Sequence, residues 1–274
     1  MSALLIVLIL AVAQGVAEFL PVSSSGHLLV LGSWFGFDAE KNMTLNVVLH
    51  AGTLLAIVVF YFKKLLSILL EPARRKLIWL VIAGSVPAAV VGIALKVSNL
   101  DNVIFASPWV AVAGFVITAT LLLVVFGLPW KINNSEDNGV PLEKMSLKQS
   151  LLIGCCQAVA ILPGISRSGS TISAGVLGKL RKADAAEFSF LLAIPAIGGA
   201  ALLELKDMLK SSAAAYSSSD IALYAVGFAA SSIVGYAALA GLIAMLRRGK
   251  LGYFACYLYL AALVVAIVQI IKLI

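Results

Sequence analysis

Residues 14–27 read QGVAEFLPVSSSGH and residues 157–171 read QAVAILPGISRSGST, and both stretches interrupt an apolar pattern with polar residues. At a constant offset of 143 residues, the two stretches share a glutamine and a Ser/Gly core. Gln14 corresponds to Gln157, and the triplet Ser23, Ser25 and Gly26 corresponds to Ser166, Ser168 and Gly169. The same offset aligns Gly84 with Gly227 and Gly92 with Gly235. The chain therefore contains an internal duplication, and each copy breaks its helical pattern at a hydroxyl-rich motif.

The composition is that of an integral membrane protein. Hydrophobic residues make up 62% of the chain, charged residues only 12%, and the mean hydropathy is +1.06, whereas soluble domains are about 25% charged. The net charge of +7 does not indicate nucleic-acid binding, because the cations lie in short loops between apolar segments. The first segment lacks a basic n-region and a cleavage site, so we expect it to be retained. The three cysteines form no metal-binding or disulfide pattern.

Six apolar segments approach the roughly 20 residues that a membrane-spanning helix needs. They are residues 45–62, 77–95, 109–128, 188–205, 221–246 and 253–274. The segments around the two polar motifs, about 3–37 and 147–180, are shorter or interrupted. We interpret each of these two as a re-entrant helix hairpin that enters and leaves on one face.

Charge distribution supports this interpretation. With hairpins, most of the 20 cations fall on one face, in the loops at 63–76, 131–148, 179–182 and 247–250. The bias disappears if the motif segments span the membrane instead, so the positive-inside rule favours hairpins and predicts that these loops are cytoplasmic.

The predicted fold is therefore an all-α polytopic membrane protein with two inverted-topology repeats, each a re-entrant hairpin plus three transmembrane helices. The first repeat covers residues 1–130, a cytoplasmic linker covers 131–146, and the second repeat covers 147–274. This architecture is typical of transporters, whose site lies at the repeat interface. Backbone that leaves helical form at membrane depth must be buried in protein or line a watery cavity, so we expect the two motifs to face each other.

Three ionisable side chains lie in the two motifs, namely Glu18, His27 and Arg167. Ionisable groups at membrane depth are costly and usually functional. Arg167 needs an anion, either Glu18 or a substrate phosphate, which suits the guanidinium fork. Ser24 and His27 are spaced i, i+3, which places a hydroxyl beside an imidazole, as in an activated nucleophile.

Both tips are also predicted anion cradles, because glycines and helix N-termini present backbone N–H groups. The candidate phosphate-binding residues are Gln14, Ser23, Ser25, Gly26, Ser166, Ser168, Gly169, Ser170 and Thr171.

Each feature also has a simpler structural interpretation. Serines of such segments commonly pack or cap helices, and Glu18 can serve as a structural partner of Arg167. His27 can be a satisfied interior histidine, and we expect His50, alone on an apolar face, to be structural. Gln14 and Gln157 can serve only to hydrogen-bond the loops. The tryptophans lie at segment ends and are typical of an interfacial belt.

The two motifs, in this order and spacing, resemble those of the undecaprenyl pyrophosphate phosphatases of the bacitracin-resistance (BacA/UppP) family. The residues that carry the resemblance are Gln14, Glu18, residues 21–27 and residues 163–171, together with the segment 187–195. The likeness covers essentially the whole chain. It implies hydrolysis of undecaprenyl pyrophosphate to undecaprenyl phosphate and inorganic phosphate, which recycles the cell-wall lipid carrier and confers bacitracin resistance. It also implies a bacterial inner-membrane location with the site open to the periplasmic face, and dependence on a divalent cation, Mg²⁺ or Ca²⁺.

Resemblance and spacing together make Ser24 the expected nucleophile and His27 its base or the leaving-group acid. Arg167 is expected to stabilise the phosphoryl oxygens, and Glu18 to orient His27 or to hold the metal. Gln14 stands where the family also uses glutamate, which leaves one carboxylate for a metal. A water molecule in place of Ser24 stays an alternative.

The predicted partners are the polyprenyl pyrophosphate lipid and the bilayer, without nucleic acid, and a homodimer is left open. The rival function is a secondary carrier or lipid flippase, which needs an anion cradle but no nucleophile. A lipid-binding scaffold would leave Arg167 and His27 unexplained.

Overall fold

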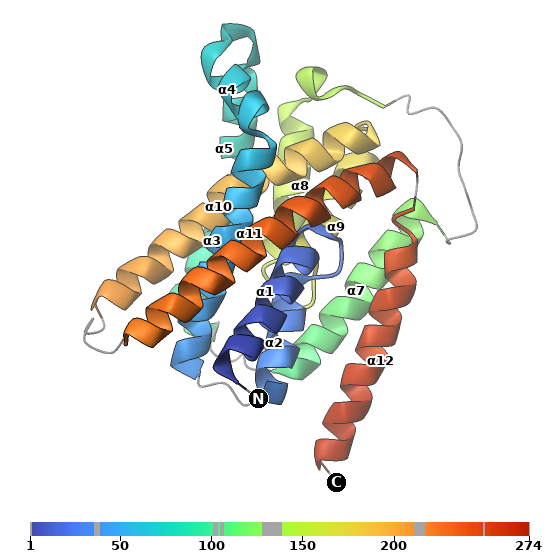
Figure 1. Cartoon of the computed structure of the whole chain (residues 1–274). Coiled ribbons are helices and arrows are strands. Elements are labelled where there is room, and N and C mark those ends of the chain that lie inside the picture. Colours follow the sequence, from blue (N-terminus) through green and yellow to red (C-terminus); the bar gives the residue numbers. More distant parts are fainter. Residues whose placement is uncertain are drawn as a thin grey trace.

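The computed structural model describes residues 2–35, 39–100, 104, 107–127, 139–210, 217–248 and 250–273. These residues are organised into helices and contain no β-strand. The first half contains α1 (Ala3–Phe19), α2 (Ser24–Phe35), α3 (Ala39–Phe60), α4 (Phe62–Leu70), η1 (Pro72–Arg74), α5 (Lys76–Val97) and α7 (Pro108–Phe126). The second half contains η2 (Leu142–Lys144), α8 (Leu147–Val159), α9 (Arg167–Leu177), α10 (Lys182–Lys210), α11 (Ser218–Arg247) and α12 (Tyr253–Leu273) (Figure 1). The expected all-α fold is confirmed for the described residues, whereas half of the predicted linker, residues 131–138, lies outside them.

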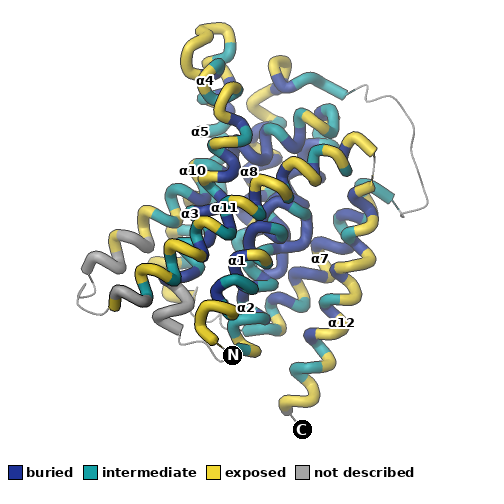
Figure 2. Tube along the Cα trace, in the orientation of Figure 1, coloured by how far each residue is buried: buried dark blue, intermediate teal, exposed yellow. Residues whose placement is uncertain are grey.

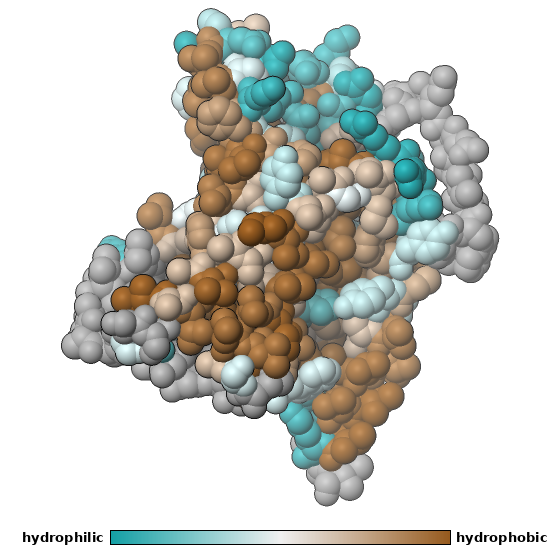
Figure 3. Space-filling view, in the orientation of Figure 1, coloured by the Kyte–Doolittle hydropathy of each residue, from teal (hydrophilic) through white to brown (hydrophobic). Residues whose placement is uncertain are grey.

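Five helices among the described residues are long and apolar enough to cross a membrane. They include α5, α7, α10, α11 and α12. A sixth span is counted if α3 and α4, which are bent by 66° at Tyr61, form one broken helix. These correspond to the six spans expected from the sequence, and a polytopic membrane protein follows. Hydrophilic residues gather at the end that bears α4, while apolar residues cover much of the middle of the visible face (Figure 3).

The two motif segments form hairpins of short helices. α1 has 17 residues and α2 has 12, and their counterparts α8 and α9 have 13 and 11. Each of these helices is shorter than a membrane-spanning helix. Antiparallel partners pack within each hairpin, α1 against α2 and α8 against α9. Dark blue, buried segments concentrate in the centre of the molecule, where the hairpins lie (Figure 2).

The two halves interlock through exchanged contacts. Helix α1 of the first half packs mainly against α11 of the second, and α8 of the second half packs against α5 of the first. Two further contacts pair corresponding helices, α3 with α10 and α7 with α12. Each hairpin is therefore held against the opposite half of the chain.

Close approach at the hairpin interfaces depends on glycine. A Cβ atom added to Gly15 of α1 would lie 2.8 Å from the Cβ of Val234 on α11. A Cβ added to Gly84 of α5 would lie 2.8 Å from the Ser150 hydroxyl oxygen on α8. The Ser150 hydroxyl donates a 2.5 Å hydrogen bond to the carbonyl of Leu80. Small residues and hydroxyl bonds of this kind pack helices inside membranes, where association gains little from the hydrophobic effect.

Candidate functional site

The first hairpin tip presents Ser24 from a strained turn. Helix α1 ends at Phe19, and Ser23 has a φ of 68°, a left-handed conformation that costs a non-glycine residue about 1–2 kcal/mol. The Ser23 hydroxyl accepts the backbone N–H of Gly26 at 3.4 Å and so caps the start of α2. Ser24 is the first residue of that helix, immediately after the strained position.

The second tip repeats this arrangement around Arg167. Gly164 has a φ of 87°, which glycine adopts without strain. The Ser166 hydroxyl accepts the N–H of Gly169 at 3.0 Å, so Ser166 is the N-cap of α9, and Arg167 is its first residue. Thr118 of α7 holds the turn, because its hydroxyl donates to the Gly164 carbonyl at 3.1 Å and accepts the Ser166 N–H at 2.9 Å.

The two tips touch each other, as the sequence predicts. The Ser168 hydroxyl donates to the carbonyl of Leu20, 3.3 Å away across the tips. A Cβ atom on Gly26 would lie 2.9 Å from the Cα of Gly164, so the two backbones meet closely. Glycine at this position permits an approach that a side chain would block.

Glu18 is the centre of the polar cluster. One of its carboxylate oxygens accepts a hydrogen bond from the Arg167 guanidinium at 2.7 Å, and the other accepts the Ser24 hydroxyl at 2.6 Å. The second oxygen also accepts the side-chain amide of Gln14 at 3.1 Å and lies 3.7 Å from Nε2 of His50. One buried carboxylate thus joins the candidate nucleophile of the first tip to the cation of the second.

Helix α10 positions the Arg167 side chain. Its guanidinium donates to the Ser189 carbonyl at 3.3 Å and lies 5.9 Å from the centre of the Phe190 ring. The Thr171 hydroxyl donates to the Arg167 carbonyl at 2.7 Å and lies 2.5 Å from the Ser189 hydroxyl. Arg167 is therefore braced at both its backbone and its side chain, which preorganises the guanidinium toward Glu18.

His27 has a different neighbourhood from the one expected. The prediction paired its imidazole with Ser24, but the Ser24 hydroxyl donates to Glu18 instead. Nδ1 of His27 bonds the Ser23 carbonyl at 2.8 Å, and Nε2 bonds the Tyr257 hydroxyl at 2.7 Å. Among the described contacts His27 has no bond to Ser24 or to Glu18, so Glu18 does not orient it. The i, i+3 spacing places Ser24 and His27 about one helical turn apart, but no hydrogen bond joins their side chains among the described contacts.

Most of the remaining predicted residues line or build the tips. Hydroxyl pairs form in both: Ser23 with Ser25 at 3.3 Å, and Ser166 with Ser168 at 3.2 Å. Gly169 makes the second close approach, since a Cβ there would lie 3.2 Å from Pro21. Ser170 is buried within α9. The capping interpretation therefore holds for Ser23, and Ser168 makes a structural link between the tips.

Sequence reasoning missed several partners of the site. His50 was expected to be structural, yet its ring faces the Glu18 carboxylate. Its position as a second histidine in an apolar segment was the available signal. Ser189 lies in the segment 187–195, which already carried the family resemblance. Thr118 and Tyr257 belong to no motif, and only the folded chain brings them to the tips.

The cluster offers a divalent metal one carboxylate ligand, that of Glu18. No group of three or more His, Cys, Asp or Glu residues is gathered within the described part of the chain. Next to Glu18, however, the side-chain carbonyl oxygen of Gln14 is buried and without a hydrogen-bond partner. An amide oxygen and a carboxylate oxygen are both hard ligands, and Mg²⁺ is commonly held by one or two carboxylates plus substrate phosphate oxygens. The residues present therefore fit a metal bound jointly with a pyrophosphate.

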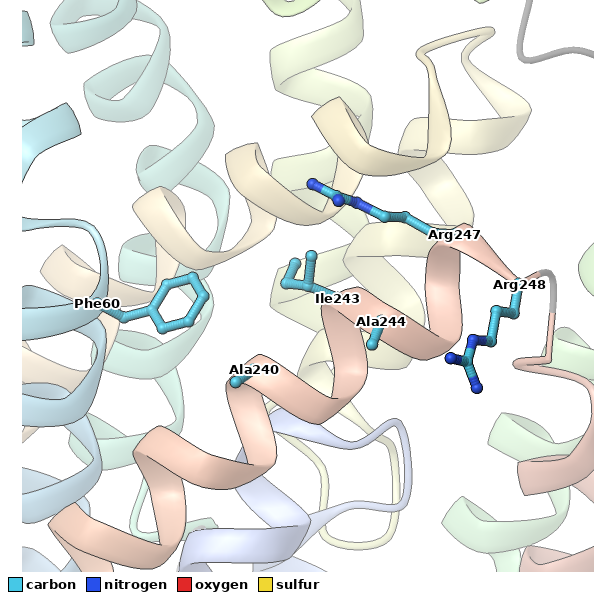
Figure 4. Close-up of a pocket in the computed structure, with 6 residues that line it drawn as sticks. All are labelled: Phe60, Ala240, Ile243, Ala244, Arg247 and Arg248. Carbon is cyan, nitrogen blue, oxygen red and sulfur yellow. The ribbon is translucent and has the colours of Figure 1, made fainter.

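A separate pocket of about 350 Å³ opens between the end of α3 and the last turns of α11 (Figure 4). It is lined by Phe60, Ala240, Ile243, Ala244, Arg247 and Arg248. None of these residues is a nucleophile or a general base, and none comes from a hairpin tip. The candidate catalytic residues lie at the tips, not in this pocket.

Comparison with known proteins assigns the family. Residues 7–264 match the family described as bacitracin resistance protein BacA. The chain belongs to this family. A protein of Rhodopirellula baltica named undecaprenyl-diphosphatase is 41% identical over 270 residues, which cover 98% of this chain and 100% of that protein. A protein of the same name from Rubrobacter xylanophilus is 40% identical, and the match covers 97% of this chain and 99% of that protein. One named undecaprenyl-diphosphatase 1, from Bacillus cereus, is 36% identical, covering 96% and 97%. The resemblance drawn from the two motifs is confirmed.

Replacing Thr118 with valine should loosen the second tip. The change is close to isosteric, but it leaves the Gly164 carbonyl and the Ser166 N–H without their hydroxyl partner in a buried site. An unsatisfied buried group costs about 1–3 kcal/mol, so the thermal unfolding temperature of the purified protein should fall clearly. Thr120→Val on the same helix is the control, because Thr120 is exposed. Equal unfolding temperatures for the two variants would contradict the role of Thr118.

Proposed function

We propose that this chain is an integral membrane phosphatase that hydrolyses undecaprenyl pyrophosphate to undecaprenyl phosphate and inorganic phosphate. Family membership supports the reaction, and one observation supports its location: Ser24 and Arg167, from different hairpins, meet on the carboxylate of Glu18. The reaction recycles the lipid carrier of the cell wall, and removal of the pyrophosphate form accounts for bacitracin resistance.

In the proposed mechanism the terminal phosphoryl group takes the place that the Glu18 carboxylate now fills beside Arg167. Arg167 binds its equatorial oxygens with the guanidinium fork, where charge is stabilised during transfer. Glu18, 2.6 Å from the Ser24 hydroxyl, takes the serine proton. The serine oxygen attacks phosphorus, the anhydride P–O bond breaks, and undecaprenyl phosphate leaves with the bond electrons.

Water then attacks the phosphoserine. The Ser24–phosphate bond breaks, inorganic phosphate is released, and the serine hydroxyl is restored with a proton. The alternative, in which water attacks the pyrophosphate directly, uses the same cation and the same carboxylate. His27 has no proton-transfer role in this proposal, because its two ring nitrogens are engaged by Ser23 and Tyr257.

A divalent cation, Mg²⁺ or Ca²⁺, is part of the proposal. The Glu18 carboxylate and the unpartnered side-chain oxygen of Gln14 would hold it, together with oxygens of the substrate. When bound, it would neutralise negative charge on the pyrophosphate.

The proposed architecture is a pair of inverted repeats, 1–130 and 147–274, joined by a cytoplasmic linker at 131–146. The exchanged packing of α1 on α11 and of α8 on α5 supports the repeat relation. The protein is proposed to lie in the bacterial inner membrane with the tips open to the periplasmic side. Its lipid substrate and the bilayer are the proposed partners.

Orientation can be tested by cysteine labelling in intact cells. In a background without the three native cysteines, Arg74→Cys and Arg248→Cys should react with an impermeant maleimide only after permeabilisation, because positive loops are retained in the cytoplasm. Ser98→Cys, at the other end of α5, is the control that should react from outside. Strong external labelling at position 74 or 248 would invert the proposed topology.

Substitution of Ser24 by alanine distinguishes the enzyme from the rival carrier. Purified protein in detergent should release phosphate from a polyprenyl pyrophosphate, and a chelator should suppress the release. Ser24→Ala should abolish the release without unfolding the protein, because the nucleophile is lost and Glu18 keeps its bond to Arg167. Lipid transport that persists while phosphate release is absent from both wild type and variant would favour the carrier.

Arg167→Lys tests whether geometry or charge matters at the second tip. Lysine keeps the charge but lacks the planar fork. We expect turnover to fall by about 10²-fold or more, comparable to removing one preorganised oxyanion donor. Thermal stability of the same preparation should change little, because Glu18 retains a cationic partner. Near-normal turnover would reduce Arg167 to a structural counter-ion.

A further inference from the structure

We infer that Tyr257 is a positioning residue of the site: acting through His27, it holds the turn that presents Ser24. The inference rests on the proposed function for its kinetic consequences, but its structural part is independent of it. Tyr257 lies on α12, at the opposite end of the sequence from the first hairpin. No motif includes it.

The His27 ring has two aromatic neighbours. The Tyr257 ring lies nearly parallel to it, with 5.7 Å between centroids and an interplanar angle of 9°, and meets it through the hydroxyl at Nε2. The Phe115 ring of α7 lies 5.0 Å away at 51°. Helix α12 packs along α7, so both aromatic contacts come from one rigid helix pair, which fixes the orientation of the imidazole.

Hydrogen bonds fix the tautomer of the imidazole. The Ser23 carbonyl can only accept, so the proton between it and His27, 2.8 Å apart, belongs to Nδ1. In the neutral ring Nε2 then has a lone pair, and this lone pair accepts the Tyr257 hydroxyl at 2.7 Å. The Ser23 carbonyl thereby selects the tautomer, and the tyrosine hydroxyl stabilises it by donating to Nε2. No lone pair is left over for Ser24.

The His27 side chain acts on the turn through the carbonyl of Ser23. This carbonyl accepts the Nδ1–H of the His27 ring and also the His27 backbone N–H at 3.3 Å. Ser23 is the residue with the left-handed backbone, and such conformations persist when the surroundings over-determine them. Ser24 follows directly, and its hydroxyl must reach both Glu18 and the phosphorus. A displacement of about 1 Å in such a group costs about 10²-fold in rate.

Tyr257→Phe tests the hydroxyl alone, since the aromatic ring is retained. We expect kcat to fall about tenfold or more with KM nearly unchanged, because Ser24 is misplaced while phosphate binding by Arg167 is intact. The matched control is Tyr259→Phe, which removes a hydroxyl on the same helix that bonds Thr120 of α7 at 2.8 Å. It should leave kcat unchanged.

Nitrogen NMR of ¹⁵N-histidine-labelled protein gives a readout that packing alone would not move. The chain has two histidines, so His50→Gln assigns the spectrum. Tyr257→Phe should shift the His27 Nε2 resonance, and Tyr259→Phe should not. An unchanged His27 spectrum in Tyr257→Phe, or an unchanged kcat, would overturn the inference.

His27 itself provides the decisive pair. The amide of His27→Asn can place an N–H near the Nδ1 position and donate to Ser23, whereas the longer amide of His27→Gln reaches toward the Nε2 position. If His27 acts by holding the Ser23 carbonyl, the asparagine variant should retain at least tenfold more kcat than the glutamine variant. Equal losses of kcat in the two variants would overturn this positioning role and make His27 a proton-transfer group. If wild type itself releases no phosphate, the proposed reaction fails, while the NMR comparison still decides whether Tyr257 bonds His27.

Discussion

The ion pair between Glu18 and Arg167 is the contact on which the rest of the site depends. Its two members lie on different hairpins, and each hairpin is packed against the opposite half of the chain. A buried carboxylate or guanidinium without a partner is strongly unfavourable, so correct docking of the two halves is coupled to neutralisation of both charges. The same pair holds Arg167 at a fixed place, where the proposed mechanism needs it.

Backbone geometry explains how a membrane protein can host this pair. A helix that begins at membrane depth exposes N–H groups that lipid cannot satisfy. Here serines cap the new helices, with Ser23 at α2 and Ser166 at α9, while Thr118 satisfies two backbone groups of the second turn. The residues that begin these helices are thus also residues of the predicted anion cradle. The same residues therefore satisfy the backbone hydrogen-bonding groups of the tips and shape the candidate site.

The sequence predicted two hairpins of short helices that contact each other, because the breaks in the apolar pattern are local to each motif. The catalytic roles of Glu18, Ser24 and Arg167 stay predictions. The sequence could not predict which side chain accepts the hydrogen bond of the Ser24 hydroxyl. Spacing placed His27 one turn away, but the choice was decided by Tyr257, which occupies the imidazole, and by Glu18, which accepts the serine hydroxyl. Both effects depend on packing between distant segments. The contact of His50 with Glu18 was not predicted for the same reason, since the sequence around an isolated polar residue does not show what faces it across a helix interface.

Ser24 and Arg167 share a structural position, the first residue of the second helix in each hairpin, directly after the capping serine. They also correspond at the offset that relates the two copies of the motif. A protein with two identical copies would therefore have either two serines or two arginines at these positions. The pairing of Ser24 with Arg167 exists only because the duplicated positions have diverged. Duplication within one chain allowed a symmetric frame to acquire an asymmetric centre, which an assembly of identical single repeats could not encode.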